Sequence, residues 1–277
     1  MKFIKPKNIN NLYETLDNLD QQYLLAGGTD INVQIKNGTI RNPNIVYINH
    51  LTELNGIEEK NDLILIGSTT SFSEIINSRI IKKHLPLIHS SLQNFASPLL
   101  QTSATIGGNI ANASPTADVI PILLVLDAKL MLGSKDNTRE VFLKDFFTGY
   151  KKTVMKSNEL ITKIIISKNA ESKYQTFYSK VGSRNSLTIA KVAVSSMKRV
   201  EHEKITDIKI AVGSLNEYPR RLYKVEEYII GKSITDIDYE KVEEFLNMEI
   251  TPISDLRSDK EYRYHVCVNL IRTFLNE

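Results

Sequence analysis

Two short segments, each built around a pair of adjacent glycines, constrain this chain more than any other feature. The first reads "LLAGGTDI" (residues 24–31), and the second reads "TSATIGGNIANASPTAD" (residues 102–118), directly before the apolar run "VIPILLVLDA". Paired glycines lack Cβ atoms and permit positive φ, so successive backbone N–H groups can point at one anion. Each segment alone is compatible with an ordinary turn. Together, about eighty residues apart, they predict an extended, phosphate-bearing cofactor held between two units.

Composition and charge exclude several other classes of site. The chain has 35 Lys and Arg against 32 Asp and Glu, interspersed, which argues against a nucleic-acid partner. The single cysteine, Cys267, excludes a disulfide framework and cysteine-ligated iron–sulfur or structural zinc sites within this chain, and the five histidines form no metal pattern. No apolar run reaches the ~20 residues of a membrane span. The N-terminus turns polar too soon for a secretory signal, so we expect a cytoplasmic protein.

The hydrophobic pattern predicts two α/β units before about residue 170. The first has a helix in "NNLYETLDNL", a strand in "QYLLAGGTD", a short helix closed by Gly38 and a strand in "NPNIVYINH". The second begins near residue 51 with the hairpin "GIEEKNDLILIGST", and a capping box at Ser71 and Glu74 starts a helical stretch to about Phe95. The small-residue segment then predicts a loop. A helix at 119–128, the hairpin "KLMLGSKDNTREVFL" and the strand "NELITKIIIS" complete this unit.

The pattern changes after residue 170. The segment "TIAKVAVSSMKRV" alternates like a half-buried strand, and "EKITDIKIAVGS" is its natural antiparallel partner. Helical spacing follows at 225–230, 238–246 and 261–275. An antiparallel meander followed by helices predicts an α+β domain.

The polar residues beside the glycines have expected structural roles. Thr29 and Asp30 can cap the helix after the first pair, where a diphosphate would also interact with the helix dipole. Asp118 begins an apolar helical run, so we expect an N-terminal cap and, in addition, an acceptor for ribitol or ribose hydroxyls. The chain has no G-x-G-x-x-G after a strand, no glycine-rich loop ending in Gly-Lys-Ser/Thr and no G-x-S-x-G, which argues against a Rossmann fold, NTP hydrolysis and a serine nucleophile.

The two glycine segments resemble the FAD-binding signatures of the FAD subunit in molybdenum hydroxylases, a family that includes xanthine dehydrogenase and carbon monoxide dehydrogenase. Later segments, among them "FYSKVGSRNSLTIAKVAVS" and "DLRSDKEYRYHVCVNLIRTFL", resemble the same family. The resemblance covers essentially the whole chain and implies an α+β fold. A PCMH/vanillyl-alcohol-oxidase-type FAD-binding domain would span 1–170, with subdomains at about 1–52 and 53–170. An α+β C-terminal domain, an antiparallel sheet plus a helical bundle, would span 171–277.

The resemblance also implies a set of FAD-binding residues, with no catalytic residue and no metal ligand. Gly27, Gly28 and Thr29 would donate backbone N–H groups to the diphosphate, and a side chain at Gly107 or Gly108 would collide with the cofactor. Core packing is an alternative role for Phe95 and Ile161, and solvation is an alternative for Lys180. The full set is Leu24, Leu25, Ala26, Gly27, Gly28, Thr29, Asp30, Ile31, Phe95, Thr102, Thr105, Ile106, Gly107, Gly108, Asn109, Thr116, Asp118, Ile161 and Lys180.

The function implied by the resemblance is that of an electron-transfer flavoprotein subunit, an oxidoreductase component of a xanthine dehydrogenase-like complex. The chain lacks cysteine-rich and molybdopterin-binding regions, so an iron–sulfur subunit and a molybdopterin-binding subunit would be separate partners. NAD+ or another acceptor would take the electrons from FAD. Two alternatives stay open: a stand-alone flavin reductase or oxidase of the same fold, and a non-catalytic scaffold subunit.

Overall fold

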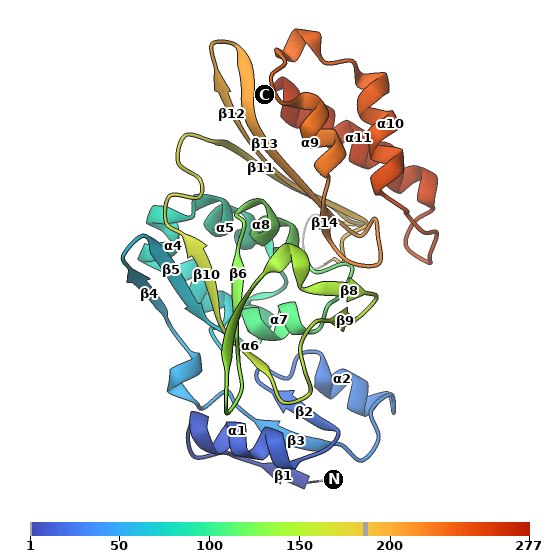
Figure 1. The fold of residues 1–277 in the computed structure, drawn as a ribbon. Helices are drawn as coiled ribbons and strands as arrows, with labels where there is room; N and C mark the ends of the chain where they lie inside the picture. The colour runs from blue at the N-terminus through green and yellow to red at the C-terminus, as the bar shows by residue number, and fades with distance from the viewer. Residues whose placement is uncertain (1, 185–187) are drawn as a thin grey trace.

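The computed structural model describes residues 2–184 and 188–277, and its elements form three units in chain order from one end of the molecule to the other (Figure 1). The N-terminal unit is a three-stranded parallel sheet with strand order β1-β3-β2 and two helices. Leu12, Leu16 and Val46 are buried in its small core, which also includes Leu160 from the middle unit. The elements are β1 (Lys2–Ile4), α1 (Ile9–Asn18), β2 (Gln22–Leu25), α2 (Ile31–Lys36) and β3 (Asn44–Tyr47).

The middle unit combines an antiparallel sheet, in the order β4-β5-β10-β6-β7, with a group of short helices. The central strand β10 comes last in the chain and pairs with β5 on one side and β6 on the other. The strands are β4 (Ile57–Lys60), β5 (Leu63–Gly67), β6 (Lys129–Gly133), β7 (Thr138–Phe142), β8 (Phe147–Gly149), β9 (Lys152–Thr153) and β10 (Leu160–Ser167). The helices are η1 (Thr52–Leu54), α3 (Phe72–Asn77), α4 (Arg79–His84), α5 (Pro86–Ser91), η2 (Leu92–Asn94), α6 (Pro98–Ser103), α7 (Ile106–Ala111), α8 (Val119–Val125) and η3 (Leu143–Asp145).

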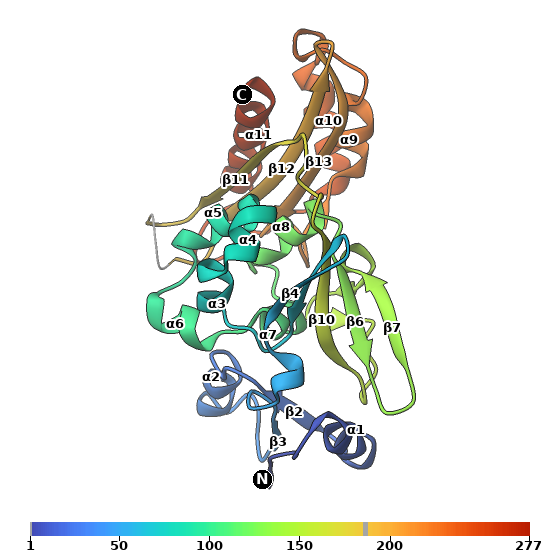
Figure 2. The same ribbon diagram turned by 90° about the vertical axis from the view of Figure 1, so that its left-hand side faces the viewer.

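The C-terminal unit is a four-stranded sheet, in the order β11-β12-β13-β14, with α9, α10 and α11 on one face (Figures 1 and 2). Helices α5 and α8 of the middle unit contact its strands as well. The expected half-buried strand β12 is therefore buried on both faces over its first seven residues. The elements are β11 (Gln175–Val181), β12 (Val192–Glu201), β13 (Lys204–Gly213), β14 (Arg220–Arg221), α9 (Tyr223–Ile229), η4 (Ile234–Asp236), α10 (Tyr239–Glu249) and α11 (Lys260–Asn276).

The small-residue segment, expected to be a loop, contains the end of α6 and the whole of α7, and it is a loop only in the remainder. Ser97 caps α6, whose first residue is Pro98, and the Thr105 hydroxyl accepts the Gly108 N–H at 3.2 Å to cap α7. These caps outweigh the poor helix propensity of Gly107 and Gly108, which costs roughly 1 kcal/mol per glycine. The second glycine pair therefore lies in the first turn of a helix.

The other differences from the expected elements have local causes. The helical stretch to Phe95 is divided into α3, α4, α5 and η2, because Ser78 caps a new helix and Pro86 starts another. The expected capping box at Ser71 and Glu74 is present. Among the described residues, no helix is long and apolar enough to cross a membrane.

Candidate functional site

A cleft of about 600 Å³ lies between the N-terminal and middle units, and both glycine pairs line it. The turn between β2 and α2 forms one wall, and the first turn of α7 forms another. Gly27 packs against the end of α6, where a Cβ atom on this glycine would lie 1.6 Å from the carbonyl oxygen of Ser103. Twelve of the predicted residues line this cleft: Leu24, Ala26, Gly27, Gly28, Thr29, Asp30, Ile31, Thr105, Gly107, Gly108, Asn109 and Ile161.

The two glycine pairs differ in what their N–H groups can bind. In the first turn of α7, Gly107 donates to the carbonyl of Ser68 at 2.9 Å, and Gly108 donates to the Thr105 hydroxyl. At the other wall, no acceptor within residues 2–184 and 188–277 is bonded to the N–H groups of residues 27–30. The turn between β2 and α2 therefore has four successive backbone donors available for an anion.

Close packing within the protein explains three of the four glycines. A Cβ on Gly107 would lie 2.5 Å from Ser68 Cβ, and one on Gly108 would lie 2.9 Å from Thr105 Oγ1. A side chain at Gly107 or Gly108 would therefore collide with the protein itself, whether or not a cofactor is bound. Gly27 meets Ser103 in the same way, whereas Gly28 is required by its φ of +72°.

Side chains from residues 151–161 form a third wall, of which sequence reasoning included only Ile161. Lys151 and Lys156 bring two positive charges to the cleft. The carboxylate of Glu159 also lines it, but Arg139 binds both carboxylate oxygens, at 2.8 and 2.9 Å. The hydrogen bond from Arg139 lowers the pKa of Glu159. The dense lysines of "YKKTVMKSNEL" are the sequence signal for this wall, since lysines near a glycine turn suit a phosphate group.

A second hollow, of about 320 Å³, lies between α5, the start of α8 and β11. Phe95, Asp118 and Lys180 line it together, although they are far apart in the sequence. Lys180 Nζ donates to Asp118 Oδ2 at 2.7 Å, and the two side chains are only 9% and 13% exposed. Burial raises the pKa of Asp118, while Lys180 opposes that rise. Tyr178 and Ser91, which sequence reasoning missed, line the same hollow, and burial raises the pKa of Tyr178 well above its ordinary value.

The expected helix caps at Asp30 and Asp118 are wrong. Neither side chain caps its helix: Asp118 binds Lys180 instead, and Asp30 accepts a hydrogen bond from the Gln34 side chain. In both cases a nearby side-chain donor competes with the backbone N–H groups for the carboxylate. Lys180 is also not the solvated strand residue that was the alternative, because its side chain is buried in the ion pair.

Four predicted residues line neither hollow. Ile106 is fully buried in the core, and Leu25 belongs to β2. The Thr102 hydroxyl donates to the Leu99 carbonyl at 2.8 Å, and the Thr116 hydroxyl lies 3.1 Å from that of Ser114. These residues support the backbone on which the lining residues lie.

Two known protein families match this chain, one over each part. Residues 1–168 match the family described as the FAD binding domain in molybdopterin dehydrogenase, and residues 177–277 match the CO dehydrogenase flavoprotein C-terminal domain. The chain belongs to this family. It is an FAD-binding medium subunit of the molybdenum hydroxylase type, and FAD is its cofactor.

Individual relatives agree with this assignment. The chain is 30% identical to the glyceraldehyde dehydrogenase medium chain of Sulfolobus acidocaldarius, over 95% of this chain and 93% of the relative. It is 28% identical to the xanthine dehydrogenase FAD-binding subunit of Escherichia coli O157:H7, over 93% and 88% of the two chains. A solved carbon monoxide dehydrogenase chain from Hydrogenophaga pseudoflava matches its fold with a TM-score of 0.94 at 24% identity, over 100% and 96% of the two chains.

The residues of the cleft fit the chemistry of an FAD subunit. A diphosphate requires several donors and positive charge, and the β2–α2 turn and Lys151 with Lys156 supply them. Two further polar atoms at the cleft residues, Asn109 Oδ1 and Ser68 Oγ, are buried without a hydrogen-bond partner among the described residues. Such atoms are rare in folded proteins unless a ligand or water binds them.

Proposed function

We propose that the FAD diphosphate binds in the cleft between the β2–α2 turn and α7, and that another part of FAD reaches the hollow at Asp118 and Lys180. The observation that carries this proposal is the set of four N–H groups of residues 27–30, which have no acceptor among the described residues and line the same cleft as the second glycine pair. The segment 95–118 lines both hollows, since its ends at Phe95 and Asp118 line the second hollow and its middle lines the cleft. The cleft-lining residues of its middle are Ala104, Thr105, Gly107, Gly108, Asn109, Ala111 and Asn112. A single extended cofactor following this segment accounts for both sets of lining residues.

The residues of this chain would then bind and orient FAD rather than react. The N–H groups of residues 27–30 and the ammonium groups of Lys151 and Lys156 would neutralise the diphosphate. Asp118, with its charge balanced by Lys180, would accept hydrogen bonds from cofactor hydroxyls. Phe95 would provide an aromatic surface beside them. When bound, FAD supplies the redox chemistry, exchanging electrons with partner centres and hydride with a nicotinamide.

The biological role we propose is electron transfer in a xanthine dehydrogenase-like complex. Relatives bear the names "medium chain" and "FAD-binding subunit", which support separate partner subunits for this chain. One partner would carry iron–sulfur clusters and the other the molybdopterin cofactor. Electrons from the clusters would reach FAD on this chain and pass to NAD+ or another acceptor.

Anaerobic reduction of the FAD-loaded protein tests this role. We expect the full chain to take up one FAD and the complex purified with its partner subunits to contain iron and molybdenum. If NAD+ is the acceptor, NADH will bleach the visible flavin absorption of the complex by the reverse reaction. Bleaching by the substrate of the molybdenum subunit, but not by NADH, would assign a different acceptor. A chain that purifies without partner subunits and reduces its own substrate would contradict the proposed role.

A further inference from the structure

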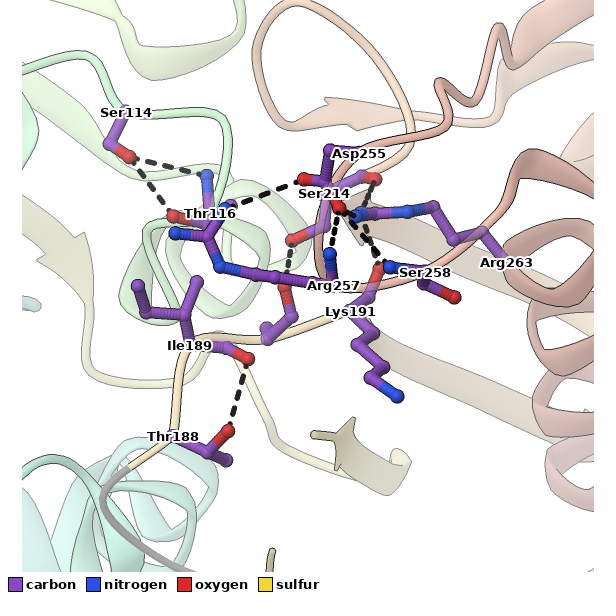
Figure 3. A network of polar contacts seen from close by, with 11 residues as sticks. Ser114, Thr116, Thr188, Ile189, Lys191, Ser214, Asp255, Arg257, Ser258 and Arg263 are labelled. Atoms are coloured by element: carbon purple, nitrogen blue, oxygen red, sulfur yellow. Dashed lines mark hydrogen bonds and ion pairs between the residues drawn. The ribbon is translucent and has the colours of Figure 1, made fainter. Parts of the chain in front are cut away.

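Ser214, the residue directly after β13, is hydrogen-bonded to two segments that are distant in the sequence (Figure 3). Its N–H donates to the carbonyl of Pro115 at 2.9 Å, and its hydroxyl donates to the carbonyl of Ala190 at 3.0 Å. Its φ is +67°, a strained conformation for a residue with a side chain, and it is 5% exposed. Such strain persists where the surrounding contacts over-determine the backbone.

Arg263 on α11 is hydrogen-bonded to the backbone at Ser214 (Figure 3). Its Nη1 donates to the carbonyls of Ser214 at 3.0 Å and Lys191 at 2.9 Å, and its Nη2 donates to Asp255 Oδ1 at 2.8 Å. The side chain is only 3% exposed, so Asp255 balances a buried charge. The guanidinium thus fixes the ends of β13 and of the β11–β12 connection at one place.

The two tied segments lead to the two members of the buried ion pair. Pro115 lies three residues before Asp118. On the other side, Lys191 donates its N–H to the carbonyl of Val181, the residue after Lys180, at 2.8 Å. Lys180 Nζ also lies 3.5 Å from the carbonyl of Thr188. A displacement at Ser214 would therefore change how the Asp118 segment lies relative to the Lys180 segment.

We infer that Ser214 and Arg263 are positioning residues that set the geometry of the Asp118–Lys180 pair and, through it, the affinity for FAD. The inference rests on the proposed placement of FAD beside that pair. Neither residue lines either hollow, so both act through the backbone segments that they join. This assigns a cofactor-related role to an arginine on the C-terminal helix, far in the sequence from the glycine pairs.

Ser214→Gly is the cleanest test, because glycine accepts the φ of +67° and keeps both backbone hydrogen bonds. It removes only the bond from the hydroxyl to Ala190, so the fold should be retained. We expect the Kd for FAD, measured by fluorescence quenching on the full chain, to rise about fivefold, the equivalent of one hydrogen bond.

Two variants of Arg263 and one control complete the test. Arg263→Met should raise the Kd for FAD further, and Arg263→Lys should restore part of the affinity lost in Arg263→Met. His202→Gly is the matched control, since His202 also has a positive φ but lies in the β12–β13 turn.

The pH profile of FAD binding distinguishes positioning from general destabilisation. Asp118 faces Lys180 and Tyr178, both on β11, and Lys180 keeps the pKa of the buried Asp118 from rising further. A looser pair in Ser214→Gly should therefore move the acid limb of FAD binding to higher pH, whereas His202→Gly should leave it in place. Wild-type affinity and an unchanged profile in Ser214→Gly and Arg263→Met would overturn the inference while the proposed function stands. A wild-type chain without FAD affinity would overturn both.

Discussion

Tertiary contacts can change the role that the local sequence predicts for a single residue. Asp118 follows the pattern of a helix cap, yet a lysine 62 positions later in the chain takes its carboxylate. Both residues were predicted as part of the site, but no local pattern shows that they pair. The predicted glycines do line the cleft, because their lack of a side chain is visible in any sequence. Lys151, Lys156 and Tyr178 were missed because only the folded chain brings them to the hollows.

Glu171, in the connection between β10 and β11, gives a prediction at the same scale. One of its oxygens accepts the Leu87 N–H at 2.9 Å, and the other is buried without a partner among the described residues. Burial raises the pKa of Glu171 from 4.5 to about 7. The folded state therefore binds the proton of the Glu171 carboxyl more tightly than the unfolded state does. The resulting contribution to the free energy of unfolding is fully present below pH 4.5 and is lost as the pH rises to about 7.

Glu171→Gln should remove this dependence, because the amide stays neutral. Relative to wild type, the free energy of unfolding of the variant should rise between pH 4.5 and 7 by up to about 3 kcal/mol. Urea unfolding at several pH values measures the difference. Glu58→Gln on β4, where the carboxylate is 55% exposed, should show no comparable trend. If the free energy of unfolding of Glu171→Gln differs from that of wild type by the same amount at every pH from 4.5 to 7, the raised pKa of Glu171 is contradicted.

Elements with a strong hydrophobic period were predicted from the sequence, whereas several short elements were not. The helices α9, α10 and α11 and the hairpin of β12 and β13 were predicted from their hydrophobic patterns. Strand β1 has three residues, too few to show any period, and its parallel pairing with β3 depends on a distant segment. Helix α7 was predicted as a loop because its glycines oppose helix formation, whereas Thr105 and the contact with Ser68 stabilise it.

The contact between the β2–α2 turn and the end of α6 leads to a second prediction. Gly27→Ala would place a Cβ atom 1.6 Å from the Ser103 carbonyl, so the turn must move away from α6. We expect FAD affinity to fall by at least tenfold, roughly 1.4 kcal/mol, with the C-terminal unit still folded by circular dichroism. Gly149→Ala is the control, since its Cβ would have contacts no closer than 3.7 Å. Equal FAD affinity in the two variants would show that this turn does not bind the cofactor.

At the scale of the whole molecule, the middle and C-terminal units share a packed interface. Helix α8 is buried along its whole length and contacts β12 and β13. Asp127, just after α8, pairs with Lys209 and with Arg221, the latter at 3.0 Å. The sequence predicted a change of pattern at residue 170 but not this interface, because each unit alone reads as a complete α/β or α+β pattern.

This interface predicts that FAD stabilises the molecule as a whole. Free FAD at a hundred times its Kd should raise the free energy of unfolding by about 2.7 kcal/mol. Thermal unfolding monitored by tyrosine fluorescence and by release of flavin fluorescence should give coincident transitions. Flavin release well below the main transition, or two separate protein transitions, would contradict a cofactor bound across the cooperative unit.

The position of β10 has a consequence for the synthesis of the chain. This strand lies at the centre of its sheet but is the last of the five to be made, so the β4–β5 and β6–β7 hairpins cannot join until Ser167 has left the ribosome. Until then β5 and β6 each present an unpaired edge, the kind of surface on which nascent chains associate wrongly. A nascent chain that stops before residue 160 lacks the strand that joins the two halves of this sheet.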